Sequence, residues 1–148
     1  MAKTILSQGT GVPVMTAQHE ANHDVKVRFV DALFRNDWET MAELVTDDLE
    51  LQEPDALPYG GTWKGLDGFK KCWELIPQAS HVVEHLDTLR TFFSEDPNHI
   101  WVELDFKGVK KATGEKFGTR VMEEFQFRDG KISVIALMWF NIPAFDKA

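Results

Sequence analysis

The sequence is poor in cysteine, in basic charge and in long apolar runs, and each shortage excludes a class of protein. One cysteine, Cys72, is too few for an internal disulfide or a cysteine-rich metal site, and it fits a reducing compartment such as the cytoplasm. A net charge of −8 argues against nucleic acid as a partner, because phosphate binding needs a basic surface. No run reaches the ~18 apolar residues of a membrane span, and the N-terminal residues lack the apolar core and cleavage site of a signal peptide. We expect a cytoplasmic protein with neither a membrane nor a nucleic-acid partner.

Apolar and aromatic residues, in contrast, are plentiful. Hydrophobic residues make up 43% of the 148 residues and include 11 Phe and 5 Trp, enough for one packed core. Residues 1–15 are small, polar and rich in glycine, and are expected to form a flexible N-terminal arm. Residues 16–148 are expected to form a single domain.

The first half of the chain is mainly helical in pattern, and the second half has the pattern of strands. Between residues 16 and 36, apolar side chains recur at steps of three and four residues, as on one face of a helix. Asp37 can cap a second, short helix, and a third begins near Asp67 and ends at Pro77. After Pro77 the apolar period changes to two, which indicates a series of half-buried strands and an α+β fold.

The last apolar segment, "KISVIALMWFNI" at 131–142, is apolar on both faces. One face can cover the helices, and the other needs a second cover. We therefore expect a homodimer that forms through the outer face of the sheet.

Two glutamates lie on strand faces that are otherwise apolar. Glu53 shares a face with two leucines in the segment 47–53, and Glu123 is the only ionisable residue in the stripe Val121-Glu123-Phe125-Phe127. Burial among apolar side chains penalises a charged carboxylate and so raises its pKa. A raised pKa suits a general acid or base near neutral pH. If both face one cavity, one can take a proton while the other donates a hydrogen bond.

Other readings of the polar residues stay open. Each glutamate can instead reach solvent at a strand end or pair with a lysine or arginine. Asp55 competes with Glu53 for the role of base, although its place in "EPDALP" is typical of a turn. His81 and His85, four residues apart in "SHVVEH", are expected on one strand face, where His85 with an acid partner could remove a proton or assist a leaving group. The alternative is a histidine at a strand edge that faces solvent.

Three segments carry a resemblance to a known family: "FVDALFRNDWETMAELVTDDLELQEP", "YGGTWKGLDGFKKCW" and the strand block ending "FQFRDGKISVIALMWF". Over about residues 20–142 the chain resembles the SnoaL-like and ketosteroid-isomerase-like enzymes of the nuclear transport factor 2 (NTF2-like) superfamily. The resemblance implies an α+β cone in which a strongly curved antiparallel or mixed sheet wraps around three N-terminal helices. It is less specific for the reaction, because the superfamily includes isomerases, lyases, cyclases, hydrolases and proteins that are not enzymes.

The resemblance also implies roles for individual residues. Glu53 stands where isomerases keep an aspartate base, and Glu123 stands where they keep the acid that donates to the oxyanion. Phe29 replaces the tyrosine expected on the first helix, so isomerisation of a 3-keto-steroid is not expected. Tyr59, the only tyrosine, could supply a hydroxyl from a loop. Other members use a histidine on the strand after the third helix, which here corresponds to the region of His85.

The sequence therefore predicts an acid–base enzyme of isomerase or lyase type that acts on a small hydrophobic cyclic or aromatic molecule. Glycine-rich phosphate loops, nucleophile elbows and metal-binding helix motifs are missing from the sequence, so we expect no cofactor and no metal. Glu53 is the expected base, Glu123 the acid or oxyanion partner, and His85 a further catalytic candidate. The expected pocket lining comprises Phe29, Tyr59, Trp63, Val121, Phe125 and Trp139. The alternatives are a lyase with a histidine–acid dyad, a polyketide-cyclase-like enzyme, and a non-catalytic module for ligand binding or dimerisation.

Overall fold

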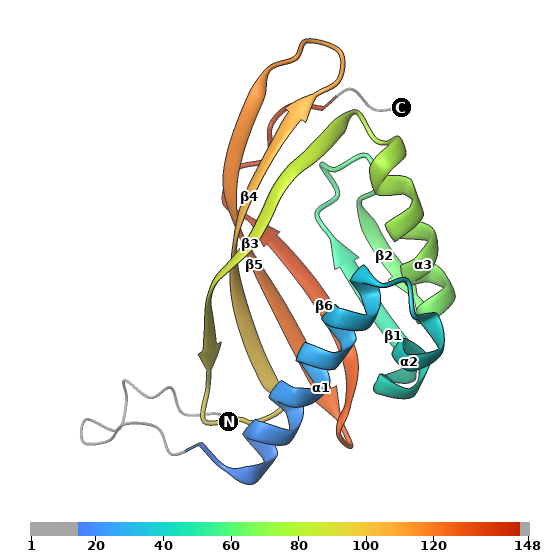
Figure 1. Ribbon diagram of the computed structural model, residues 1–148, viewed down its shortest axis with the longest axis vertical. Helices are drawn as coiled ribbons and strands as arrows, with labels where there is room; N and C mark the ends of the chain where they lie inside the picture. Colours follow the sequence, from blue (N-terminus) through green and yellow to red (C-terminus); the bar gives the residue numbers. More distant parts are fainter. Residues whose placement is uncertain (1–14, 146–148) are drawn as a thin grey trace, which may run out of the picture.

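In this computed structural model a curved sheet packs against helices on one of its faces, within residues 15–145, the part of the chain that the structure describes (Figure 1). The helices are α1 (Ala17–Phe34), α2 (Trp38–Leu44) and α3 (Gly65–Leu75), and a 3-10 turn, η2 (Ile76–Gln78), follows α3. The strands are β1 (Val45–Glu53), β2 (Gly61–Lys64), β3 (His81–Phe93), β4 (His99–Lys110), β5 (Lys116–Arg128) and β6 (Lys131–Trp139). The expected arm, residues 1–15, lies outside the described residues except for Met15.

The sheet has six strands in the order β2-β1-β6-β5-β4-β3. β1 and β6 run parallel, and every other neighbouring pair is antiparallel. The last strand of the chain therefore enters the middle of the sheet, between β1 and β5. Figure 1 shows β3, β4 and β5 curving along one side of the molecule, with α1 and α3 across from them. The expected α+β fold with a curved mixed sheet is confirmed.

Alternation along the strands sorts side chains between the two faces of the sheet, as the sequence predicts. In β4, Ile100, Val102 and Phe106 are buried on the face that meets the helices, and Val121 and Phe125 of β5 join them. On the outer face β6 leaves a methionine, Met138, 44% exposed. Whether a second copy covers this face stays a prediction. None of the described helices combines the length and the apolar character that crossing a membrane requires.

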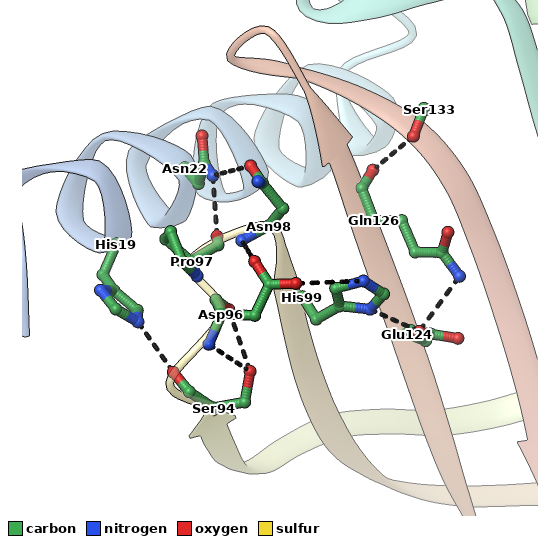
Figure 2. A network of polar contacts seen from close by, with 10 residues as sticks. All are labelled: His19, Asn22, Ser94, Asp96, Pro97, Asn98, His99, Glu124, Gln126 and Ser133. Atoms are coloured by element: carbon green, nitrogen blue, oxygen red, sulfur yellow. Dashed lines mark hydrogen bonds and ion pairs between the residues drawn. The ribbon is translucent and has the colours of Figure 1, made fainter. Parts of the chain in front are cut away.

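Buried polar contacts tie α1 to the turn between β3 and β4 (Figure 2). His19 donates through Nε2 to the carbonyl oxygen of Ser94 at 2.8 Å. Asn22 is fully buried and donates to the carbonyl oxygen of Pro97 at 2.8 Å. Both side chains are buried and donate to main-chain carbonyl groups, and a buried polar side chain without a partner is costly. The network thus holds the first half of α1 in a fixed position over the sheet.

Removing the Asn22 amide should destabilise the fold. We expect Asn22→Ala to lower the free energy of unfolding by about 1–3 kcal/mol, because the partly buried Pro97 carbonyl oxygen loses its donor. Urea denaturation followed by circular dichroism measures this change. Glu20→Ala, an exposed position on the same helix, is the matched control and should change stability by less than about 0.5 kcal/mol. Equal effects of the two substitutions would contradict the anchoring role of Asn22.

Candidate active site

A cavity of about 880 Å³ lies between the helices and the concave face of the sheet. Its wall is mostly apolar and is built by α1, α3 and the inner faces of the strands. A volume of this size can hold a small organic molecule of several rings. The polar side chains that reach the wall include Lys26, Glu53, Tyr59, Cys72, His81 and Glu123.

The two glutamates singled out in the sequence meet in this cavity. β1 and β5 flank β6, Glu123 is paired with Leu137 of β6, and Gln52 is level with the preceding β6 residue, Ala136. Glu53 and Glu123 therefore project from nearly the same level on opposite sides of β6, with Cα atoms separated by roughly 10 Å, two strand spacings. Asp55, the competing base, is exposed in the turn that follows β1 and does not line the cavity.

Glu53 is deeply buried without a compensating partner. Among residues 15–145, nothing donates a hydrogen bond to its buried Oε2. Burial, and then the charge of Glu123, raise the pKa of Glu53 to about 8. The residue as a whole is half-buried and lines the cavity. At neutral pH this carboxyl group is mainly protonated and can donate a hydrogen bond into the cavity.

Glu123 differs from Glu53 because it has a cation nearby. Burial raises the pKa of Glu123 to about 7, and the ammonium of Lys26 opposes that rise. Lys26 lies on α1 and is only 7% exposed, and burial lowers its pKa while Glu123 raises it. Lys26 was not predicted from the sequence, because the buried face of α1 also carries the polar residues His19 and Asn22, and so no apolar stripe marks its position.

The expectation that His81 and His85 share one strand face is wrong. A bulge shifts the register of β3, because Val83 pairs with Gly108 and His85 already pairs with Lys107. The extra residue turns His85 to the outer face, 3.3 Å from Asp105, and away from the cavity. His85 thus has an acid partner, but the pair lies outside the site where the glutamates meet.

His81 takes the place in the cavity that was expected for His85. It is fully buried, its Nε2 lies 3.4 Å from the Tyr59 hydroxyl, and its ring stacks on Phe145 with centroids 4.5 Å apart. Its Nδ1 has no hydrogen-bond partner among the described residues. Burial, followed by the charge of Lys111, lowers the pKa of His81. The imidazole is therefore neutral at neutral pH.

The apolar lining agrees with the sequence except at one tryptophan. Phe29, Val121, Phe125 and Trp139 line the cavity, as does Tyr59. Trp63, expected among them, does not, because its indole Nε1 donates to the Tyr59 carbonyl oxygen at 3.0 Å. Trp63 therefore fixes the loop that carries Tyr59 and does not line the cavity. Within residues 15–145, no three His, Cys, Asp or Glu side chains gather where they could hold a metal ion.

Residues 27–135 match the model of the SnoaL-like domain family. The chain belongs to this family. A search of curated proteins by sequence found no match.

Solved structures share the fold at low sequence identity. An NTF2-like protein from Burkholderia xenovorans LB400 has a TM-score of 0.67 and 17% identity, and the match covers 81% of this chain and 89% of that one. TerC, co-crystallised with polyporic acid, has a TM-score of 0.64 and 16% identity over 80% of this chain and 91% of its own. A hypothetical protein with a ketosteroid isomerase-like fold, from Catenulispora acidiphila and in complex with trimethylamine, has a TM-score of 0.61 and 13% identity over 82% and 88%. At these identities the likeness establishes the shared fold.

The buried glutamates should make this SnoaL-like domain less stable as the pH rises. The folded-state pKa values of about 8 for Glu53 and about 7 for Glu123 exceed the ordinary 4.5. The folded protein therefore keeps protons that the unfolded chain releases above about pH 4.5. The stability that these retained protons contribute is complete below that pH and is lost as the pH rises through the folded pKa. The free energy of unfolding then falls by up to about 1.4 kcal/mol per pH unit for each group.

Urea denaturation between about pH 5 and about pH 9 measures this slope. We expect Glu53→Gln to flatten the slope and to exceed the wild-type stability at about pH 8 by roughly 1–4 kcal/mol. Glu50→Gln is the matched control from the same strand. Glu50 is hydrogen-bonded to Lys64, which holds its pKa below the ordinary value, so its removal leaves the slope over this range unchanged. Parallel curves for wild type and Glu53→Gln would contradict the burial of an uncompensated carboxyl group.

Proposed function

We propose that the protein is an acid–base enzyme that moves a proton on a small apolar ring compound held in the cavity, with its own carboxyl groups as the acid and the base. One observation carries the proposal. Glu53 and Glu123 project from opposite sides of β6 into the same apolar cavity, and burial shifts the pKa of each toward neutrality. Such a pair can hold one proton and one negative charge at the pH of a cell.

The charges around the pair favour a particular division of roles. Glu123 has the Lys26 ammonium nearby, which stabilises its carboxylate, whereas Glu53 has the negative charge of Glu123 nearby and an unpartnered oxygen. Glu123 is therefore the better base and Glu53 the better proton donor. This division reverses the one expected from the resemblance, which made Glu53 the base.

The proposed step is proton abstraction from a carbon next to a carbonyl group. The Glu123 carboxylate takes the proton, and the electron pair of the broken C–H bond forms the carbon–carbon double bond of an enol. The carbonyl π electrons move to the oxygen, which receives a proton or a hydrogen bond from Glu53. Return of a proton to another carbon gives an isomer, and loss of a leaving group from the enol gives an elimination.

The lining supports a flat, apolar substrate. Phe29, Phe106, Phe125 and Trp139 present aromatic surfaces to the cavity, and rings prefer to pack on rings. TerC, a structural neighbour, was co-crystallised with polyporic acid, which is an example of this fold crystallised together with an organic compound. Because the identity with TerC is low, the residues of this cavity carry the proposal.

Deuterium exchange into 2-tetralone, a flat ketone with acidic protons next to its carbonyl group, tests the reaction. We expect the wild-type protein to accelerate exchange in D₂O, with a rate maximum between about pH 7 and about pH 8, where Glu123 is ionised and Glu53 is protonated. Glu123→Gln and Glu53→Gln should each slow exchange by ~10²–10⁴-fold. Mass spectrometry of the recovered ketone gives the rate.

Glu124→Gln is the matched control for this experiment, because Glu124 is the next residue of β5 and faces away from the cavity, toward His99. It should keep the wild-type rate. Retention of full activity by Glu123→Gln, with the variant folded, would contradict the proposed base. Tight binding of 2-tetralone by a wild-type protein that does not accelerate exchange would favour a non-catalytic ligand-binding module.

A second candidate function is a lyase or cyclase in which His81 is the base. Its support is the buried Nδ1 of His81, which has no partner among residues 15–145, and the neutral state of the ring. His81→Gln separates the candidates. It should leave the exchange rate nearly unchanged if the carboxyl pair acts, and abolish turnover if His81 is the base.

We also propose that two copies pair through the outer face of the sheet. Its support is exposed apolar surface there: Met138 is 44% exposed, and Phe140, just after β6, is 72% exposed. Sedimentation velocity should show a dimer that Met138→Asp shifts toward monomer. Leu75→Asp, at a similarly exposed position on α3, should not shift it. A monomer at all concentrations would contradict the pairing.

A further inference from the structure

We propose that Lys26 is the binding subsite for an anionic oxygen of the substrate, so that the cavity selects flat apolar compounds that carry a carboxylate, enolate or phenolate group. The inference deepens the proposed function, on which it rests for the identity of the cavity as the substrate site. It concerns recognition, whereas the carboxyl pair concerns proton transfer. Different experiments therefore test recognition by Lys26 and proton transfer by the carboxyl pair.

Lys26 is placed as a ligand-binding group. It is 7% exposed, lines the cavity from the middle of α1, and is flanked there by Phe29 and Val30. Among the described residues, no oxygen accepts a hydrogen bond from its ammonium, and no carboxylate forms an ion pair with it. The ammonium nitrogen itself keeps some exposed surface, so it opens onto the cavity and is not sealed in the wall. An oxygen anion that enters the cavity would supply the missing acceptor.

The other charged groups of the cavity leave this role open to a ligand. Of the described residues that line the cavity, Lys26 is the one lysine or arginine. Asp31 lines the cavity from α1, but its carboxylate already pairs with Arg35 at 2.9 Å. Glu53 and Glu123 can hold protons near neutral pH, since the pKa of each is raised to about 8 and about 7. Among the described residues that line the cavity, Lys26 therefore supplies the one positive charge.

The neutral polar groups do not change this balance. Burial raises the pKa of the Tyr59 hydroxyl above its ordinary value and raises that of the Cys72 thiol to about 12, so both stay uncharged. Burial lowers the pKa of His81, which is also neutral. An anionic ligand therefore meets one fixed positive charge, on the wall opposite the sheet. The ammonium has three N–H donors, so it can bind the ligand oxygen while it stays near Glu123.

The geometry also fits the proposed reaction. Lys26 comes from α1, whereas Glu53 and Glu123 come from β1 and β5 of the sheet, so the anionic oxygen and the reacting carbonyl are held from two sides. A ligand fixed at both ends has fewer orientations than one held only by apolar contact. Lys26 thus determines specificity by non-covalent binding of the substrate.

Binding of two matched probes tests the inference. 2-Naphthoate carries a carboxylate that is ionised at about pH 7, and 2-acetonaphthone is an uncharged ketone of nearly the same shape. We expect the wild-type protein to prefer 2-naphthoate, and Lys26→Met to weaken 2-naphthoate binding by roughly 10- to 100-fold, the loss of one charge-assisted hydrogen bond. Binding of 2-acetonaphthone should change by less than about 3-fold. Isothermal titration calorimetry measures both affinities.

Two further variants keep the test decisive. Lys26→Arg keeps the charge and should keep the preference for 2-naphthoate, whether or not Lys26→Met folds well. Lys70→Met removes an exposed lysine of α3 that lies over the Trp38 ring, and should leave both affinities unchanged. Equal wild-type affinity for the probes, no binding of 2-naphthoate, or equal losses for both probes in Lys26→Met would overturn the inference. Because Glu53→Gln should keep the preference, failure of the exchange reaction alone would remove the proposed function and leave this subsite standing.

Discussion

The site depends on the burial of two carboxyl groups in an apolar cavity that offers them one cation. A carboxylate in such surroundings loses its hydration. The protonated form is therefore stabilised relative to the charged form, and the pKa rises. Glu53 has an unpartnered oxygen and no nearby cation, whereas Glu123 has Lys26. This difference separates an acid from a base within one cavity.

The fold supplies this arrangement at a cost in stability. β6 enters the sheet between β1 and β5, and so sets the spacing of Glu53 and Glu123. The network around Asn22 and His19 fixes α1, which brings Lys26 over the sheet. A cavity wall with buried charge and little internal hydrogen bonding is less stable than a packed core. Natural proteins commonly accept such a cost at functional sites.

Strand periodicity was enough to predict much of the site, and it failed where the backbone is irregular. Glu53 and Glu123 follow the alternation of regular strand segments, so their shared face could be predicted from the sequence. His85 could not be placed, because a bulge in β3 adds one residue between it and Val83 and reverses its face. Trp63 is aromatic and near the pocket in the chain, yet its indole finds a backbone acceptor. Lys26 could not be predicted, because its neighbours on the buried face of α1 include His19 and Asn22, so the sequence shows no apolar stripe around it.

Carbon-detected NMR titration of the carboxyl groups, with the glutamates assigned by Glu53→Gln and Glu123→Gln, tests whether burial and Lys26 set the two pKa values apart. We expect Glu53 to titrate near pH 8 and Glu123 near pH 7, and Lys26→Met to raise the pKa of Glu123 further, toward that of Glu53. Titration of both groups near the ordinary 4.5, with no response of Glu123 to the loss of Lys26, would contradict this expectation.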